Sequence, residues 1–351
     1  MKKILFQSDY NEGAHPAILE MLAKTNFEQT PGYGVDDHCK HAADMIRHIC
    51  NAPDADVHFL VGGTQANVTV ISSILRSHQG VVCAASGHIN VHETGAVEHG
   101  AHKNLALPHH DGKITAQQID EYVSAHYADE STEHMVQPGM VYISFPTEFG
   151  TLYTHSELAA ISAVCHKHNM PLFIDGARIG YGLQSAACDI TLPEIAALAD
   201  VFYIGGTKQG ALFGEAVVIV NKNLQKDFRY HIKQNGGMLA KGRLLGIQFE
   251  ALLADDLYFR LARQADEQAL RIRRAFEAKG FSFLIDSPTN QQFPILDKAS
   301  IAILSNEFEF SRWEVIDDEH TAVRFCTSWA TPDSSVDTLC DAIGKLQSPK
   351  S

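Results

Sequence analysis

The sequence predicts an α/β fold built on a large, mainly parallel sheet with helices on both faces. Short apolar runs alternate with longer segments of helical spacing over the first 220 residues. Several of the runs are apolar at nearly every position, which is typical of strands buried on both faces. Strands that alternate with helices in this way are typical of parallel sheets.

Each expected strand is an apolar run that ends in glycine, proline or a polar residue. These runs are 57–63, 80–85, 140–146, 170–178, 201–208 and 215–221. Helices are expected at 64–76, where Val68, Ile71 and Leu75 share one face, and at 155–168. Ligands of open parallel sheets bind at the carboxyl ends of the strands, so the polar residues found there are candidates for a site.

The pattern changes after about residue 222. Residues 239–279 predict two helices, 333–346 predict a final helix, and the segments 280–296, 298–304 and 322–330 predict short strands. We therefore expect a large domain over residues 1–250, with its first thirty residues packed as an arm. A smaller C-terminal α/β domain is expected over residues 251–351.

Composition excludes several classes of protein. The 351 residues contain 28 Lys and Arg against 42 Asp and Glu, a formal net charge of −14. A chain this acidic is a poor general ligand for nucleic acid or anionic membranes. Seven scattered cysteines without a C-x-x-C pair, and the lack of a signal peptide or an apolar span, predict a cytoplasmic protein. The 19 histidines suggest metal, but no ligand spacing such as H-E-x-x-H occurs, so no metal site is expected.

Lys208 is the most informative residue, because it follows a buried strand within the string Gly205-Gly206-Thr207-Lys208. A lysine in such a place could form a Schiff base, which requires an amine of lowered pKa. A surface lysine in a turn is the alternative. Glycines that let another group approach the backbone favour the first interpretation.

Two further strand ends carry chemistry. Asp175 ends an apolar strand and opens Asp175-Gly176-Ala177-Arg178. It is a structural cap, an ion-pair partner of Arg178, or a carboxylate that holds a protonated heterocycle. Gly62-Gly63-Thr64 begins a predicted helix, where free N–H groups suit a phosphate or a simple cap.

With these three strings together, the sequence resembles the low-specificity L-threonine aldolases of the aromatic amino acid β-eliminating lyase/threonine aldolase group. The strings Gly63-Thr64-Gln65-Ala66-Asn67 and Asp175-Gly176-Ala177-Arg178 carry most of the resemblance, and Gln7-Ser8-Asp9, Tyr33-Gly34, His88 with Glu93, and Val323-Arg324-Phe325 add to it. The resemblance implies a pyridoxal 5′-phosphate enzyme of the aspartate aminotransferase fold (fold type I), with sites formed between subunits of a homodimer or homotetramer.

The resemblance also implies residue roles. Lys208 would bind the cofactor as a Schiff base, Asp175 would pair with its pyridine nitrogen, and His88 would stack on its ring. Gly63, Thr64 and Thr207 would hold the phosphate, with one basic residue of Arg229, His231 and Lys233. Ser8, Arg178 and Arg324 would bind the substrate carboxylate, and Tyr33 would reach the neighbouring site.

The implied reaction cleaves threonine, allo-threonine or phenylserine to glycine and an aldehyde, and it needs a base for the β-hydroxyl proton. Many family members carry a histidine where this chain has Glu148. We expect the base to be His88, His92 or Glu148. The alternatives are β-elimination or transamination of another amino acid, and a non-catalytic homologue.

Overall fold

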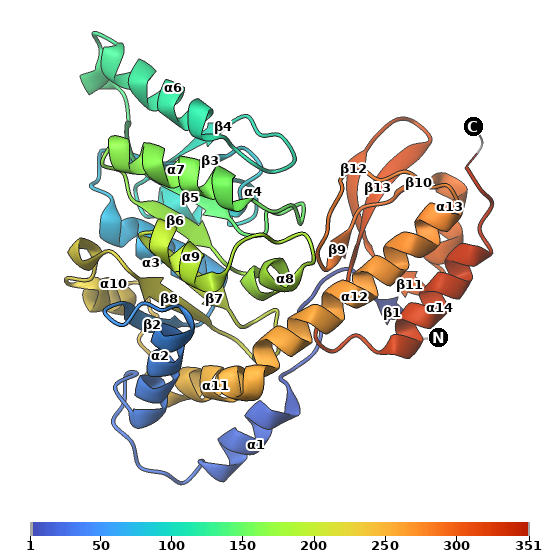
Figure 1. The fold of residues 1–351 in the computed structure, drawn as a ribbon, viewed down its shortest axis with the longest axis horizontal. Helices are drawn as coiled ribbons and strands as arrows, with labels where there is room; N and C mark the ends of the chain where they lie inside the picture. Colours follow the sequence, from blue (N-terminus) through green and yellow to red (C-terminus); the bar gives the residue numbers. More distant parts are fainter. Residues whose placement is uncertain (1–2, 350–351) are drawn as a thin grey trace.

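The computed structural model describes residues 3–349, and its larger lobe contains a seven-stranded sheet (Figure 1). In spatial order the strands are β2 (Asp56–Leu60), β8 (Glu215–Ile219), β7 (Val201–Gly205), β6 (Leu172–Asp175), β5 (Gln137–Ser144), β3 (Gln79–Ala84) and β4 (Lys103–Leu107). Neighbouring strands from β7 to β4 are parallel, whereas β8 is antiparallel to both of its neighbours. The predicted mainly parallel α/β sheet is confirmed.

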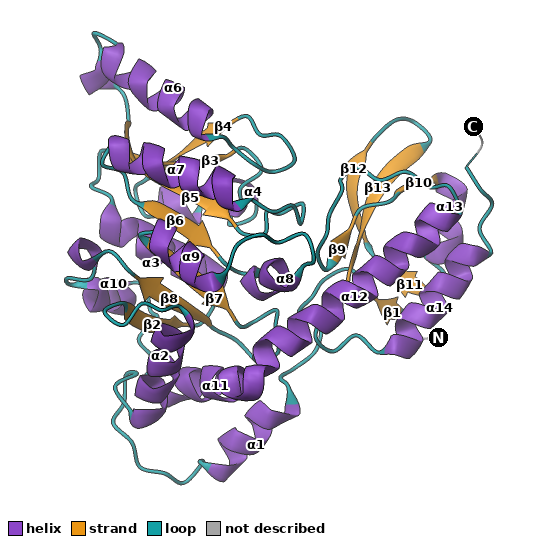
Figure 2. Ribbon diagram, in the orientation of Figure 1, coloured by secondary structure: helices purple, strands orange, loops and turns teal. Residues whose placement is uncertain are grey.

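Helices bury both faces of this sheet (Figure 2). Phe173 and Ile174 are adjacent on β6 and belong to different apolar clusters. Phe173 shares its cluster with Val70 of α3, and Ile174 shares the other with Leu158 of α7. Alternate side chains of a strand point to opposite faces, so a strand buried on both sides is apolar throughout.

The helices around the large sheet begin and end as follows: α1 (Pro16–Lys24), α2 (Asp37–Ile49), α3 (Gly63–Ile74), α4 (His88–Val91), α5 (Ala96–His99), α6 (Ala116–Ala128), α7 (His155–Lys167), α8 (Ile179–Gln184), α9 (Leu192–Leu198), α10 (Phe228–Gln234) and α11 (Arg243–Leu253). Three of them, α6, α7 and α9, begin with a capping box in which a threonine and a Gln or Glu exchange hydrogen bonds. Short 3₁₀ turns lie at Thr132–His134, Lys222–Leu224 and Ala254–Asp256.

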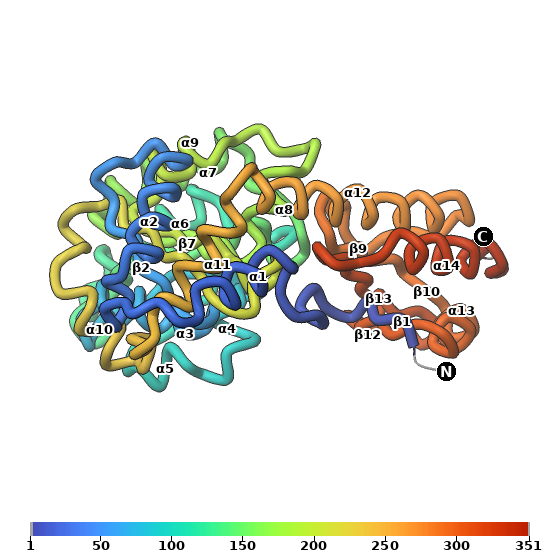
Figure 3. The backbone as a smooth tube through the Cα atoms, turned by 90° about the horizontal axis from the view of Figure 1, so that it is seen from below, coloured from blue at the N-terminus to red at the C-terminus, as the bar shows by residue number. Residues whose placement is uncertain are grey.

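A second, smaller sheet forms around β13 (His320–Cys326), which pairs with β10 (Ile295–Asp297), β12 (Ser311–Val315) and β9 (Gln291–Gln292). The N-terminal strand β1 (Ile4–Leu5) pairs with β11 (Phe308–Glu309), so residues 4–5 lie beside the last third of the chain (Figure 3). Phe6 is buried in the apolar cluster of this smaller lobe. The domain division near residue 250 stays a prediction.

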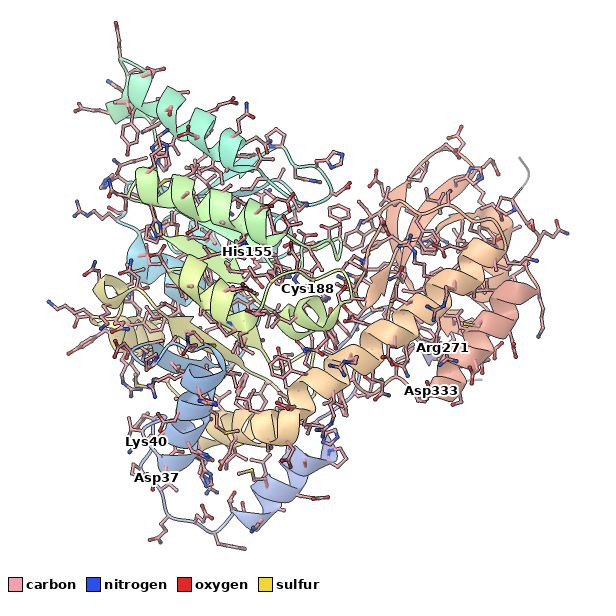
Figure 4. The ribbon with its side chains drawn as sticks, in the orientation of Figure 1. Asp37, Lys40, His155, Cys188, Arg271 and Asp333 are labelled. Atoms are coloured by element: carbon pink, nitrogen blue, oxygen red, sulfur yellow. The ribbon has the colours of Figure 1, made fainter. Side chains whose placement is uncertain are left out.

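Long helices connect the two lobes. The helical region expected at 239–279 is α11 followed by α12 (Leu257–Ala278), separated by Asp255 and Asp256 in the left-handed conformation. Arg271 on α12 points toward Asp333 at the start of α14 (Asp333–Gly344), with 2.9 Å between Nη1 and Oδ1 (Figure 4). Among residues 3–349, no helix combines the length and apolar character required to cross a membrane.

Two sequence expectations differ from the structure. Residues 298–304 form helix α13 (Lys298–Leu304) and not a strand, because the Asp297 side chain accepts a hydrogen bond from the Ser300 amide and caps a helix there. Strand β4 was not predicted, since Lys103 and Asn104 interrupt its short apolar pattern.

Candidate active site

A cavity of about 300 Å³ lies at the carboxyl ends of β5, β6 and β7. Asp175 at the end of β6, Ser144 at the end of β5, and Lys208 just beyond β7 all border it. A second cavity of about 320 Å³ lies next to it. The residues that line both are Tyr10, His88, Glu148, Arg178 and Lys208. The two cavities are therefore parts of one site, at the sheet edge where ligands of this architecture bind.

The Asp175 carboxylate is buried in the wall of this site and accepts four hydrogen bonds. The hydroxyls of Tyr142 and Tyr203 donate over 2.6 and 2.5 Å, and Asn67 Nδ2 and the Ala177 amide donate over 3.0 Å each. A carboxylate that accepts several hydrogen bonds is stabilised in its charged form. The site therefore contains a fixed negative charge.

The pKa of Asp175 is consistent with that charge. Burial raises the pKa, but the neighbouring His88 and the hydrogen bonds from Tyr142 and Tyr203 bring it below its ordinary value. Asp175 is therefore ionised at neutral pH. It can accept a hydrogen bond from a protonated ring nitrogen, as a pyridine cofactor requires.

Lys208 presents an amine without a protein partner. Among residues 3–349, no hydrogen bond or ion pair to its Nζ is found, while its carbonyl accepts a hydrogen bond from the Tyr181 hydroxyl over 2.5 Å. Burial and the nearby charge of Arg178 lower its pKa. The neutral amine, which is the nucleophile, is therefore more populated at neutral pH than in a solvated lysine.

His88 is held by a buried carboxylate. Its Nδ1 lies 2.7 Å from Glu93 Oε1, and the same oxygen accepts a hydrogen bond from Asn67 Nδ2 over 2.7 Å. Because Asn67 also donates to Asp175, the four side chains form one chain of hydrogen bonds. A carboxylate at Nδ1 favours the tautomer with its proton there and leaves Nε2 as an acceptor.

The two other candidate bases, Glu148 and His92, also line the site. Glu148 Oε1 accepts hydrogen bonds from Ser144 Oγ over 2.6 Å and from the His88 amide over 2.8 Å. Burial raises the pKa of Glu148, and the charge of Asp175 adds to that rise. Burial and the charges of His88 and Arg324 lower the pKa of His92, whose ring centre lies 5.6 Å from that of His88. The structure brings all three candidates together.

Helix α3 begins at the opposite side of the cavity. Gly62 occupies its N-cap position, and no side chain caps the helix. Gly62, Gly63 and Thr64 all line the cavity. An uncapped helix start offers N–H groups and a favourable dipole to an anion, so this part of the site suits a phosphate.

Arg324 borders the second cavity and has no acidic partner among the described residues. Its guanidinium donates to the Gln291 side chain over 3.2 Å and to the Gln7 carbonyl over 3.0 Å, and it lies 4.9 Å from the centre of the Trp313 ring. Its Nε is buried without a hydrogen-bond acceptor. Arg324 is thus an oriented cation with unused donor capacity, which suits a carboxylate ligand.

Arg178 and Ser8 are already engaged within the protein. Arg178 binds Asp9 through two hydrogen bonds of 2.7 and 3.0 Å, and Asn290 donates to the same carboxylate. Burial raises the pKa of Asp9, but the charges of Arg178 and Lys208 hold it at about 2. Ser8 is buried and donates to Asn11 over 2.8 Å. The predicted contacts of Arg178 and Ser8 with substrate stay predictions.

Tyr33, and the basic residues expected to help bind the phosphate, lie away from this cavity. Arg229 donates to the Tyr33 carbonyl over 3.0 Å, and Lys233 Nζ lies 5.1 Å from the Tyr33 ring centre. These residues line other cavities of the described chain, together with Tyr230 and Met238, and not the one around Lys208. No basic residue of this segment completes the phosphate end of the site within one chain.

Several residues of the site were not singled out by sequence reasoning. Tyr142 and Tyr203 lie within apolar strands, where an aromatic residue is expected simply to pack, and Glu215 begins a strand. The only available signal was the alternation of side chains along each strand. Tyr203, for example, lies on the strand that leads to Lys208, at the same sheet edge as Asp175. Asn67 was part of a recognised string, but its contact with Asp175 required the fold.

The residues present fit pyridoxal 5′-phosphate. An ionised carboxylate, an unpaired lysine amine and an uncapped helix start share one cavity. Each corresponds to one part of that molecule: its ring nitrogen, its aldehyde and its phosphate.

Comparisons with known proteins agree with this site. A family model described as beta-eliminating lyase matches residues 6–299. The chain is 30% identical to a low specificity L-threonine aldolase of Pseudomonas sp. (strain NCIMB 10558), with 98% of each chain covered. It is 44% identical to Leishmania major threonine aldolase over 97% of this chain and 98% of the other, with a TM-score of 0.94. Aspartate aminotransferase of Thermus thermophilus shares the fold, with a TM-score of 0.71, 11% identity, and 98% and 91% of the two chains covered. The chain therefore belongs to the beta-eliminating lyase family of pyridoxal phosphate enzymes, and within it to the threonine aldolases that the sequence resembles.

Proposed function

We propose that this protein cleaves L-threonine and related 3-hydroxy amino acids, including allo-threonine and phenylserine, to glycine and an aldehyde. The supporting relatives are named as threonine aldolases and match the chain over nearly its whole length. The single observation that carries the proposal is that one continuous site contains Lys208, Asp175 and the unpaired guanidinium of Arg324.

Lys208, Asp175 and the start of α3 would hold pyridoxal 5′-phosphate, which when bound withdraws electrons from the substrate α-carbon. The protein must then select which bond at that carbon is weakened. Arg324 is suited to this task, because a planar guanidinium fixes the orientation of a carboxylate through two parallel hydrogen bonds. Gln291, Gln7 and Trp313 hold the guanidinium in place before substrate arrives.

Cleavage between the α- and β-carbons also requires removal of the proton of the β-hydroxyl. His88, with Nδ1 bound to Glu93, offers Nε2 as an acceptor. His92 is neutral at pH 7 because its pKa is lowered, and it lines the part of the site that contains Arg324. Glu148 has a raised pKa, which also brings it closer to the working range of a general base. A base in this position typically accelerates a reaction by ~10²–10⁴-fold.

A substrate panel tests the proposal directly. Purified protein with pyridoxal phosphate is incubated with L-threonine, L-allo-threonine, phenylserine or serine, and glycine, aldehyde, ammonia and pyruvate are measured. We expect equal amounts of glycine and aldehyde from the first three. Release of ammonia without glycine would instead indicate β-elimination, and a Lys208→Ala variant with undiminished activity would contradict the assigned site.

We also propose a homodimer or homotetramer in which Tyr33 contributes to a neighbouring site, and a cytoplasmic location. The ring of Tyr33 is half exposed beside Tyr230 and Val35, and a second subunit covering these residues would bury them. All seven cysteines are free thiols, as expected in a reducing compartment. Light scattering coupled to size-exclusion chromatography measures the assembly, and a monomer would contradict the shared site.

A further inference from the structure

Glu215 is a buried carboxylate in the wall of the cofactor cavity, and the proposed reaction gives it no role. It begins β8, is only 3% exposed, and lines the cavity together with Gly63, Thr64 and Lys208. A carboxylate in a wall expected to hold an anion requires an explanation, because two neighbouring negative charges repel each other.

The hydrogen bonds of Glu215 constrain the neighbouring Thr207. Glu215 Oε2 accepts the Gly206 amide over 3.2 Å, and Oε1 lies 2.9 Å from the Thr207 hydroxyl. Thr207 Oγ1 in turn accepts the Gly214 amide over 3.0 Å. A hydroxyl has one proton and two lone pairs. When Glu215 is ionised it can only accept, so the proton of Thr207 must point at Glu215.

This arrangement conflicts with phosphate binding while Glu215 is ionised. Thr207 then has no proton to donate to a phosphate, although its side chain lines the same cavity as the uncapped start of α3. Protonation of Glu215 removes both difficulties. The acid O–H can donate to Thr207 Oγ1, which still has a lone pair beside the Gly214 bond, and the Thr207 proton becomes available.

We propose that the phosphate of the cofactor binds while Glu215 carries a proton, and that Thr207 reverses its hydrogen bond with Glu215 and donates to the phosphate. Where Glu215 is ionised in the cofactor-free protein, phosphate binding takes up one proton. Here Glu215 is a positioning residue, since it acts through Thr207. The step forms no covalent bond, and the single proton comes from solvent. The inference rests on the proposed use of pyridoxal 5′-phosphate.

The surroundings of Glu215 support a proton at neutral pH. Its pKa is raised to about 8, chiefly by burial and also by the charge of Asp175 on β6. The Thr207 hydrogen bond and the charge of Lys208 oppose that rise. The other titratable groups that face Glu215 are Tyr203 on β7 and Tyr258 on α12, both neutral because burial raises their pKa far above 10.

The experiment compares two ligands that differ only in the phosphate, pyridoxal 5′-phosphate and pyridoxal. Their affinities for the cofactor-free protein are measured by absorbance between pH 7 and 9.5. The titration of Lys208 affects both affinities equally, so it cancels in the ratio of the pyridoxal 5′-phosphate affinity to the pyridoxal affinity. In the wild type, the ratio should fall about tenfold per pH unit above the pKa of Glu215. In Glu215→Gln the ratio should be independent of pH, because a neutral amide can donate to Thr207 at every pH. The exposed Glu130→Gln is the matched control and should behave as wild type.

A pH slope that is equal in wild type and Glu215→Gln would overturn the inference. Should that variant not fold, calorimetry of the wild type at pH 8.5 in buffers of different ionisation enthalpy gives the proton count. Binding of pyridoxal phosphate should be accompanied by the uptake of about one more proton than binding of pyridoxal. Equal proton counts would overturn the inference. Absence of proton linkage with intact glycine formation overturns only the role of Glu215, whereas failure to bind pyridoxal phosphate at any pH overturns the proposed function as well.

Discussion

His88 Nδ1 lies 2.7 Å from Glu93 Oε1, and this partly buried contact connects a candidate base to the carboxylate in the cavity wall. Glu93 Oε1 also accepts Asn67, which donates to Asp175. Asn67 Nδ2 therefore joins the two carboxylates, and His88 Nδ1 contacts one of them. The arrangement makes the orientation of His88 dependent on a residue that does not line the cavity.

Glu93→Gln tests this dependence. The amide can no longer present an anionic acceptor to both Asn67 and His88, so the His88 tautomer is less strongly fixed. We expect the kcat for threonine cleavage to fall by roughly 10- to 100-fold, as for other residues that orient a histidine. Steady-state kinetics with a pH profile measures the change, and the exposed Glu133→Gln serves as control. A variant with an unaltered kcat and pH profile would show that Glu93 is only structural.

Asp175→Asn should impair catalysis more than folding. The amide keeps the shape of the side chain but loses the charge that Tyr142 and Tyr203 now stabilise. The loss of one charge-assisted hydrogen bond corresponds to about 1.5–3 kcal/mol, or roughly 10- to 100-fold in rate. Cofactor absorbance and kcat are measured on the same preparation. Normal turnover in a variant that binds the cofactor fully would contradict the role assigned to Asp175.

Arg324→Lys separates charge from geometry. Lysine keeps the positive charge but loses the planar fork and the stacking on Trp313, so the substrate carboxylate is bound less well. We expect the KM for L-threonine to rise by about 10-fold or more, with a smaller rise for Trp313→Leu. The exposed Arg312→Lys, on the same strand as Trp313, is the control. An unchanged KM in Arg324→Lys would mean that another cation binds the carboxylate.

The sequence allowed prediction of those parts of the site that are local. Asp175 and Lys208 each follow an apolar strand, and strand ends of a parallel sheet meet at one edge, so their proximity could be inferred. The ion pair of Asp9 with Arg178 joins residues 169 positions apart, and the sequence had offered Arg178 only Asp175 and the substrate carboxylate as partners. The same applies to the contact of Glu93 with Asn67. Helix α13 was mistaken for a strand because seven residues are too few for their apolar spacing to distinguish the two.

A buried histidine outside the site should make stability depend on pH. His58 packs 5.0 Å from the ring of Phe228, and its Nε2 has no hydrogen-bond partner among the described residues. Burial, together with the charges of Arg229 and Arg47, lowers its pKa to about 4. In the unfolded chain the pKa of histidine is about 6.5. Between these two values the unfolded chain binds a proton that the folded chain does not, so stability falls as the pH falls.

His58→Phe removes this titration and keeps an aromatic ring beside Phe228. Since each pH unit between the two pKa values corresponds to ~1.4 kcal/mol, the wild type should lose about 2 kcal/mol more than the variant between pH 7 and pH 5. Urea unfolding at the two pH values measures the difference, with the exposed His110→Phe as control. Above about pH 7.5 the two proteins should show the same pH dependence, because His58 is then neutral in both states. Equal losses in wild type and His58→Phe below that pH would mean that His58 gains a proton in the folded protein.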